Sequence, residues 1–168
     1  MKLSGFTLIE LLVVVMIVSV LTAIAVPQYR RTMDRSKAAE AMEVLPALFE
    51  ARERWVIEHQ CTWASGSIVC NGASPSLTVK KLDIELAGSA TLSKCPSGTS
   101  WETDNFCYAL VAGETNQACV KAVPKWGDSR NLTSAAIWYR GDKFSCNGDD
   151  DACDILNVAD DSHRTGCQ

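Results

Sequence analysis

The first third of the chain changes from uniformly apolar to amphipathic at a single point. Residues 6–26 contain one charged side chain, Glu10. At about 1.5 Å per residue, a helix of that length spans roughly the 30 Å hydrocarbon core of a bilayer. From Gln28 onward, apolar positions recur at four- and three-residue spacing, with charged side chains between them. The pattern predicts one long helix over about residues 6–58, apolar on every side in its first half and on one face in its second.

The amphipathic half is expected to pack one stripe of side chains against a core. That stripe contains Ala38, Met42, Leu45, Phe49, Arg52 and Val56, with Ala41, Leu48 and Trp55 beside it. Two prolines interrupt the pattern, Pro27 at the boundary between the halves and Pro46 inside the second. Because proline lacks a backbone N–H and its ring crowds the preceding turn, we expect a bend or a looser helix at Pro27 and a gentler bend at Pro46.

The rest of the chain changes to turns and short strands. Residues 61–94 form a connecting region rich in Gly, Pro and Ser, in which 77–82 is a short strand or a helical turn. Strands are predicted at residues 106–111, 118–123 and 135–139, with a tight turn at 140–142. The predicted fold class is α+β: the long helix packed on a small antiparallel sheet, with a disulfide-stapled C-terminal region. The predicted regions are a leader at 1–5, an apolar helix at 6–27, an amphipathic helix at 28–60 and a globular head at 61–168.

Glu10 is the feature that an ordinary apolar span does not explain. A carboxylate at the centre of a bilayer costs about 2.5–3.5 kcal/mol on insertion scales, so it needs a partner. No basic residue lies within residues 6–26. An amine freed by cleavage between Gly5 and Phe6 would supply the missing positive charge.

Two other interpretations of the segment stay open. A secretory signal peptide would be cut after the apolar run, where residues 21–25 offer an Ala-x-Ala-like site. A permanent transmembrane anchor would have the same apolar composition. Both are opposed by Glu10, and the signal peptide also by the single basic residue, Lys2, and by the helical pattern that continues past Pro27.

Residues 5–10 read Gly-Phe-Thr-Leu-Ile-Glu and resemble the prepilin peptidase recognition site of the type IV pilin family. The shared features are a short leader with a Lys, a Gly before the cut, a Phe after it, and a Glu five places into the mature chain. The resemblance continues through residues 11–15 and 25–29 and covers about residues 1–55. Ser19 stands where many of these pilins have Gly.

The resemblance implies cleavage between Gly5 and Phe6, N-methylation of Phe6, and contact of Glu10 with the new amine of a neighbouring subunit. Opposite charges in a low-dielectric filament core each carry a desolvation cost that only close pairing offsets. Glu10 would therefore set the register between subunits more than it adds net stability. The resemblance also implies that residues 19–28 can unwind when the subunit packs into a filament.

The function implied by the resemblance is that of a structural subunit of a type IV pilus. Its partners would be prepilin peptidase, the pilus assembly platform, the inner membrane before assembly, and copies of itself and other pilins in an extracellular helical filament. Twitching motility, adhesion and DNA uptake stay open, as does a major or minor role. The alternatives are a periplasmic type II secretion pseudopilin and, in another class, a membrane-anchored monomeric binding module, which predicts no cleavage after Gly5.

All eight cysteines lie between Cys61 and Cys167, outside the predicted helix. An even number confined to an exported region predicts a disulfide framework, in which each bridge typically adds about 2–4 kcal/mol. Favouring sequence neighbours, we predict the pairs Cys61–Cys70, Cys95–Cys107, Cys119–Cys146 and Cys153–Cys167. A zinc site is the competing interpretation, but the chain has no Cys-x-x-Cys spacing and only two histidines, His59 and His163.

The net charge of −4 lies in the globular part. Residues 28–60 carry six basic and six acidic side chains, whereas residues 61–168 carry nine basic and thirteen acidic ones. This balance argues against phosphate-backbone binding by a single subunit, so we predict no specific nucleic-acid binding. The chain has no Gly-rich phosphate loop and neither histidine has an obvious nucleophile partner, so we predict that it is not an enzyme.

Three short motifs remain. Asp149, Asp151 and Asp154 offer oxygen ligands that suit Ca²⁺, without the closing Glu of an EF-hand loop; pseudopilins and some pilins bind calcium in C-terminal loops, so we keep Ca²⁺ as an alternative to the absence of any cofactor. Arg140-Gly141-Asp142 matches an adhesive tripeptide, but hairpin turns favour such residues anyway. Residues 131–133 match a glycosylation sequon, which we interpret as a turn.

Overall fold

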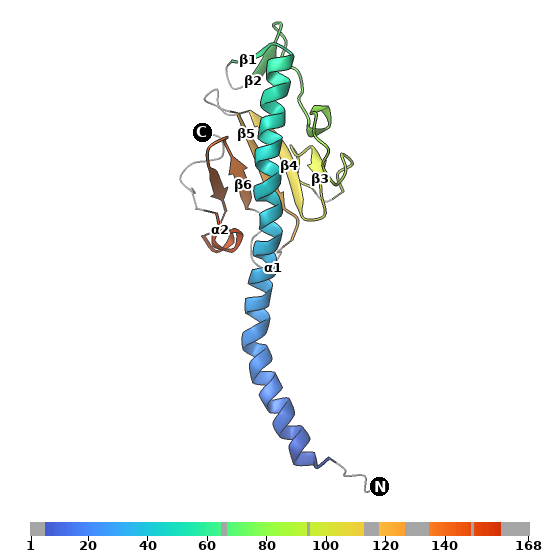
Figure 1. Cartoon of the computed structure of the whole chain (residues 1–168), viewed down its shortest axis with the longest axis vertical. Helices are drawn as coiled ribbons and strands as arrows, with labels where there is room; N and C mark the ends of the chain where they lie inside the picture. Colours follow the sequence, from blue (N-terminus) through green and yellow to red (C-terminus); the bar gives the residue numbers. More distant parts are fainter. Residues whose placement is uncertain are drawn as a thin grey trace.

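The computed structural model describes residues 6–64, 67–93, 95–112, 118–126, 135–148 and 150–158. Its dominant element is one helix, α1 (Leu8–Glu58), which is 51 residues long and therefore about 75 Å from end to end. Figure 1 shows the N-terminal half of α1 as a free stem and its C-terminal half lying across a head domain. The long helix predicted from the sequence is confirmed.

The head is built on an antiparallel sheet of five strands that lie side by side in sequence order. They are β3 (Trp101–Glu102), β4 (Phe106–Ala112), β5 (Ala118–Pro124), β6 (Ala136–Tyr139) and β7 (Phe144–Asn147). Across the sheet, Tyr108 pairs with Ala122, Ala122 with Ile137, and Ile137 with Cys146. These four side chains are buried in the core that α1 shares with the sheet. The predicted α+β meander is confirmed.

Small residues on α1 let the helix lie close to the sheet. Ala38, Ala41 and Ala51 are buried in the same core as Leu45 and Leu48. Their spacing repeats every three or four residues, which keeps them on one face of the helix. The amphipathic half of α1 thus supplies one wall of the core, and Figure 1 shows it crossing in front of β4, β5 and β6.

A single carboxylate on α1 ties the helix to the sheet. Glu40 accepts hydrogen bonds from the Thr103 hydroxyl at 2.6 Å, the Asn105 side-chain amide at 2.7 Å and the Tyr108 hydroxyl at 3.3 Å. Burial, reinforced by the nearby Glu40 charge, raises the pKa of Tyr108 well above its usual range. The phenol therefore stays protonated and remains a donor to Glu40.

Arg52 is the unexpected member of the apolar stripe, since only 1% of its surface is exposed. Its Nη1 donates to the carbonyl oxygen of Cys119 on β5 at 3.2 Å, and its Nη2 lies 3.0 Å from a carboxylate oxygen of Glu53. Burial lowers the pKa of Arg52 to about 10, which still leaves the guanidinium charged at neutral pH. The side chain thus locks α1 to β5 from inside the core.

The segment predicted as a connection contains more structure than expected. Immediately after α1, β1 (Cys61–Ala64) and β2 (Ser67–Cys70) pair as a separate antiparallel hairpin. The choice left open at residues 77–82 falls to a helical turn, the 3-10 helix η1 (Val79–Lys81). A short helix, α2 (Asp150–Leu156), follows β7, although only turns and short strands are predicted for this part of the chain.

Two of the predicted disulfides are present and two are wrong. Cys61 is bonded to Cys70 and Cys95 to Cys107, as predicted. Cys146 is bonded instead to Cys153, with their Cα atoms 5.7 Å apart, so neither Cys119–Cys146 nor Cys153–Cys167 forms. Cys119 is also disulfide-bonded, and Cys167 lies outside the described residues.

Strand order explains why Cys119 cannot reach Cys146. Cys119 lies on β5 and Cys146 on β7, with β6 between them. Two strand spacings amount to about 9.6 Å, whereas bonded cysteines keep their Cα atoms within about 7 Å. The pairing of Cys146 with Ile137, and of Ile137 with Ala122, adds a further offset along β5. Cys153 is available because β7 leads directly into α2.

Candidate functional site

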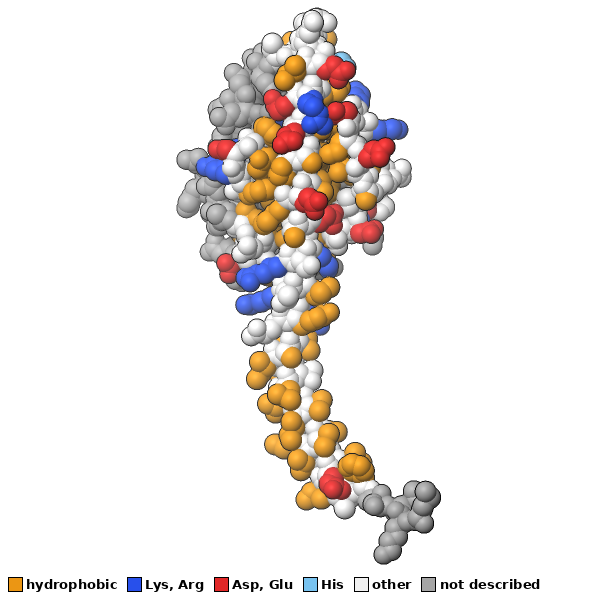
Figure 2. Space-filling model, in the orientation of Figure 1, with side chains coloured by type: hydrophobic (Ala, Val, Ile, Leu, Met, Phe, Trp, Pro, Cys, Tyr) orange, Lys and Arg blue, Asp and Glu red, His pale blue; other side chains and the backbone are white. Residues whose placement is uncertain are grey.

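The stem half of α1 presents an apolar surface that stays exposed. The large apolar side chains of residues 6–26 are all exposed, by between 40% at Val26 and 83% at Leu8, and Figure 2 shows hydrophobic side chains along the whole stem. Within the described residues, α1 is the one helix that is long and apolar enough to cross a membrane. A contiguous apolar surface of this kind marks a region that contacts lipid or another protein.

Polar side chains of the stem bond to the stem itself. Ser19 Oγ donates to the Met16 carbonyl oxygen at 2.7 Å, and Thr22 Oγ1 donates to the Val18 carbonyl oxygen at 2.7 Å. Together with Thr7 and Glu10, these are the polar side chains of residues 6–26. Their hydroxyls need no water, which suits an apolar environment.

Glu10 lies in the first turn of α1 and is held there by Thr7. The Thr7 N–H donates to Glu10 Oε2 at 2.8 Å, and the Thr7 hydroxyl donates to the same oxygen at 2.7 Å. In return, the Glu10 N–H donates to Thr7 Oγ1 at 3.4 Å. This reciprocal arrangement is a capping box, and it starts the helix at Leu8.

Sequence reasoning missed this cap, although its signal, Thr-x-x-Glu, is present at residues 7–10. The predicted need of Glu10 for a partner is therefore met in part within its own chain. The cap supplies hydrogen-bond donors but no cation. A carboxylate that is hydrogen-bonded but still charged remains costly to bury. Even with the cap in place, Glu10 would therefore gain from a positively charged partner.

The predicted cleavage site lies at the edge of the described chain. Gly5 is outside the described residues, whereas Phe6 is 78% exposed and precedes the cap residue Thr7. Phe6 is thus the residue next to the capped end of the helix. The cut between Gly5 and Phe6 and the methylation of Phe6 remain predictions.

Both prolines lie inside an uninterrupted helix. α1 continues through Pro27 and Pro46 from Leu8 to Glu58. Figure 1 shows that the stem curves toward its N-terminal end, while the part of α1 on the head is straighter. Pro46 lies between the buried side chains of Leu45 and Leu48, so packing on the head holds the helix there. Pro27 lies on the exposed stem, where no such packing supports the helix.

The candidate calcium ligands lie mostly outside the part of the chain that the structure describes. Asp149 lies outside the described residues, and the Asp151 side chain is likewise not described. Asp154 is exposed on α2. Among the described residues, no group of three or more His, Cys, Asp or Glu side chains could hold a metal ion.

The tripeptide at residues 140–142 forms the turn between β6 and β7, as predicted. Gly141 has φ +98°, and a Cβ placed there would lie 2.8 Å from Cε1 of Phe49 on α1. The turn and the nearby helix therefore account for this glycine without an adhesive role. The sequon at 131–133 lies outside the described residues.

Comparison with known proteins points to the same part of the chain. The family model described as the prokaryotic N-terminal methylation motif matches residues 1–26. A fimbrial protein of Pseudomonas aeruginosa is 35% identical over 102 residues, which cover 61% of this chain and 60% of that protein. A type IV major pilin protein of Neisseria gonorrhoeae is 25% identical over 151 residues, which cover 90% of this chain and 83% of that protein.

Other matches are shorter or cover less. A type IV major pilin protein of Myxococcus xanthus is 46% identical over 54 residues, which cover 32% of this chain and 24% of that protein. The match thus spans about three fifths of the length of the Pseudomonas relative and a quarter of the Myxococcus one. No solved structure matches the chain.

Between them, the matched motif and the relatives cover both the stem and the head. The motif covers the capped, apolar stem, and the Neisseria match extends over both the helix and the head. The resemblance drawn from residues 5–10 is confirmed. The chain carries the N-terminal methylation motif over residues 1–26, and it is similar to type IV pilins over both its helix and its head.

Proposed function

We propose that this protein is a structural subunit of a type IV pilus. It is made as an inner-membrane precursor, cut by prepilin peptidase between Gly5 and Phe6, methylated at Phe6, and polymerised into an extracellular helical filament. One observation carries the proposal: an exposed apolar stem, with a single capped carboxylate near its end, projects from a folded head.

The stem suits two environments in turn. Each large apolar side chain gains about 1.5–3 kcal/mol when it leaves water, so the stem is stable only in lipid or against other stems. Moving from lipid into a bundle of stems adds little hydrophobic free energy, because lipid tails are as apolar as Leu side chains. Polymerisation therefore needs close packing, specific polar pairing and external work. ATPases of an assembly machine would supply the work.

Glu10 supplies the specific polar pairing in this proposal. In the single subunit, Thr7 holds the carboxylate at the start of α1. In the filament, the methylated amine of Phe6 on a neighbouring subunit provides the cation. A subunit added out of register leaves both charges buried without a partner, which is strongly unfavourable. Glu10 thus acts as a register device.

Pro27 is the place where the helix would change on assembly. It lacks the backbone N–H that would bond to the preceding turn, and the stem around it has no packing support from the head. Local unwinding there would let the stems and the heads pack at independent angles. This step remains a hypothesis of the proposal.

The printed names of the relatives favour a major subunit. Those from Neisseria and Myxococcus are named as type IV major pilin proteins, whereas one relative from Dichelobacter nodosus is named as a probable minor fimbrial protein. A major pilin must be abundant and must pack against copies of itself. The names of the relatives do not distinguish among motility, adhesion and DNA uptake.

Mass spectrometry of filaments sheared from the cell surface tests the proposal. The expected result is an abundant peptide that starts at Phe6 and carries one added methyl group. A trace amount would assign a minor or tip role. A processed chain that is found only in membranes would favour a secretion pseudopilin, and an intact Met1 start in every pool would overturn the processing.

A further inference from the structure

Basic side chains gather where the apolar stem meets the head. Arg30, Arg31 and Arg35 are all exposed, and Figure 2 shows blue side chains at this junction. Lys37, the next basic residue, lies with its ammonium 5.0 Å from the ring centre of Trp126 and so faces the head. The three arginines, which we call the arginine collar, follow the last apolar turn of the stem.

The collar lies at the depth of lipid headgroups when the stem crosses a bilayer. The polar layer on each side of the hydrocarbon core is about 5–7 Å thick. Arg31 and Arg35 are five and nine residues beyond Val26, or about 7.5 and 13.5 Å along the helix. Helical side chains lean toward the N-terminus, which here is toward the membrane, so both guanidinium groups can reach back to the phosphates.

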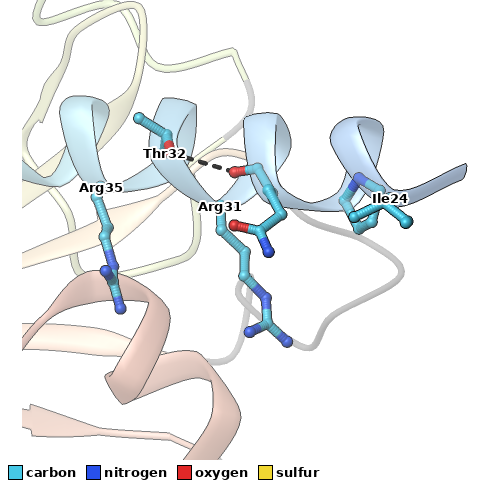
Figure 3. Close-up of a pocket in the computed structure, with 6 residues that line it drawn as sticks. Ile24, Arg31, Thr32 and Arg35 are labelled. Carbon is cyan, nitrogen blue, oxygen red and sulfur yellow. Dashed lines mark hydrogen bonds between the residues drawn. The ribbon is translucent and has the colours of Figure 1, made fainter. Parts of the chain in front are cut away.

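The two arginines share a surface cavity of about 460 Å³. Its lining also includes Ile24, Pro27 and Gln28, and Figure 3 shows Arg31 and Arg35 extending from the same side of α1. The wall nearer the stem is apolar and the wall nearer the head is cationic. This order matches a phospholipid, in which an acyl chain lies below a phosphate.

The guanidinium groups are available for an anion. In the described part of the chain, carboxylates form ion pairs with Arg52, Arg54 and Lys125, and neither Arg31 nor Arg35 has such a pair there. Thr32 is less available, because its hydroxyl donates to the Gln28 carbonyl oxygen at 3.1 Å. Arginine suits phosphate because its planar fork can donate two parallel hydrogen bonds.

We propose that Arg31 and Arg35 bind the phosphate of an anionic phospholipid headgroup in the leaflet on the head side, while the subunit waits in the membrane. The proposal rests on the proposed function for the membrane-inserted stage and extends it. The bound phosphate fixes how deep the stem sits and holds the head close to the bilayer, although residues 61–168 carry a net charge of −4 and are repelled by the same surface.

The side of the membrane supports a dedicated role for the collar. Ordinary spans concentrate Lys and Arg on the cytoplasmic side. Here one basic residue, Lys2, precedes the stem, and three arginines follow it within nine residues of Val26. The disulfide-bonded head belongs outside the cytoplasm. The collar therefore lies on the side of the membrane where Lys and Arg are usually fewer, and phosphate binding accounts for this position.

Native mass spectrometry of the full chain in neutral detergent tests this proposal. The protein is mixed with equal amounts of phosphatidylglycerol and phosphatidylcholine, and the lipid retained on it is measured. The wild-type chain should retain phosphatidylglycerol preferentially. The double variant Arg31→Gln with Arg35→Gln should reduce that retention about 25-fold, because each basic side chain near an anionic surface contributes about five-fold.

A matched control removes the same charge elsewhere. Lys80 and Lys81 are exposed on the head, in the turn η1. The double variant Lys80→Gln with Lys81→Gln should retain as much phosphatidylglycerol as the wild-type chain. Equal retention in the wild-type and collar variants would overturn the proposal, as would an equal loss in the control. If the double variant does not fold, the single variants, each expected to lose about five-fold, carry the test.

Competitors separate the possible anions. Inorganic phosphate at about 10 mM and a short DNA duplex should both leave the lipid bound; displacement by either would mean a free-phosphate or nucleic-acid site and would overturn the proposal. Lipid retention is measured on the single subunit and needs no filament. If the chain is absent from sheared filaments but still retains phosphatidylglycerol selectively, the result contradicts the proposed function and not the lipid site.

Discussion

The two halves of α1 belong to one unbroken helix but have opposite surroundings. In the stem half, every described side chain from Phe6 to Met33 is exposed. In the head half, Ala41, Leu45, Leu48 and Ala51 have no exposed surface at all. The half that is more apolar in sequence is thus the one that is less buried within the molecule.

This contrast separates two uses of apolar residues. In the head half, a stripe of them meets a sheet of the same chain and stabilises the subunit. In the stem half, they surround the helix and find no partner in the chain, so their burial awaits a bilayer or other subunits. Folding of the head and assembly of the filament should therefore respond to different substitutions.

Glu10→Ala should have the largest effect, which falls on assembly and not on the folding of the head. Without the carboxylate, the Phe6 amine of a neighbouring subunit loses its partner, so we expect few normal filaments although the protein is still inserted in the membrane. Electron microscopy of cells together with immunoblotting of membranes measures both quantities. Wild-type piliation in this variant would contradict the pairing of Glu10.

Leu48→Ala should show the converse pattern. Truncation of a fully buried leucine costs about 2–5 kcal/mol of unfolding free energy, and Leu48 is 0% exposed in the head core. Denaturant unfolding of the full chain in neutral detergent, followed by tryptophan fluorescence, measures this loss. The matched stem variant Leu12→Ala should change the same quantity by less than about 0.5 kcal/mol, and a similar loss in both would remove the distinction between the halves.

Acid should weaken the head through Glu102. The ammonium of Lys125 lies 2.6 Å from Glu102 Oε1, and this contact, followed by the Ser93 N–H, lowers the pKa of Glu102 to about 2. The pKa of this carboxyl is lower in the folded protein than its usual value of about 4.3. The charged carboxylate therefore makes its full contribution to the free energy of unfolding above about pH 4.3. It is lost as the pH falls toward 2.

Unfolding midpoints between pH 7 and pH 2 check this expectation. Glu102→Gln should be less stable than wild type at pH 7, and the difference should shrink as acid protonates the wild-type carboxylate. Asp83→Asn breaks an exposed pair with Arg54 and should change stability little at any pH. A constant difference between wild type and Glu102→Gln across this range would show that the charge of Glu102 is not what stabilises the head.

Thr7→Val should have the smallest effect. It removes the hydroxyl of the capping box and costs about 1 kcal/mol at the end of the helix, without touching the head. Amide hydrogen exchange in detergent micelles should become faster in the first turn of α1 and stay unchanged at Leu45. The control is Thr32→Val, which removes another exposed hydroxyl of the stem. If this variant also speeds amide exchange in the first turn of α1, the effect is a general one on the helix and not the loss of the cap.

Local patterns were sufficient for the helix and for strands β4, β5 and β6, and they indicated two of the disulfides. The helix follows from periodicity over about fifty residues, which short-range physics enforces at every turn. Cys61–Cys70 and Cys95–Cys107 join neighbours along the chain, as predicted, but Cys146–Cys153 does so too, so nearness in sequence alone did not fix the pairing. The Thr7–Glu10 cap also has a local signal, Thr-x-x-Glu at residues 7–10.

Contacts between distant segments were not predictable in the same way. Strands β1, β2, β3 and β7 were not predicted, and none of them has more than four residues. The hydrogen bonds of Glu40 join residues more than sixty positions apart. Arg52 occupies a position of the apolar stripe, but only the approach of β5 provides the carbonyl oxygen that makes its burial tolerable.

By itself, the sequence determined the features that each turn of the helix fixes locally: the length of α1, the apolar stem, the lone Glu10 and the point where the arginines begin. Only the tertiary structure decided which strands α1 crosses, that Cys146 bonds to Cys153 and not to Cys119, and how Glu40 and Arg52 join helix to strand. The reason is physical. Helical periodicity is a short-range property, whereas strand order and buried polar contacts depend on how remote segments meet.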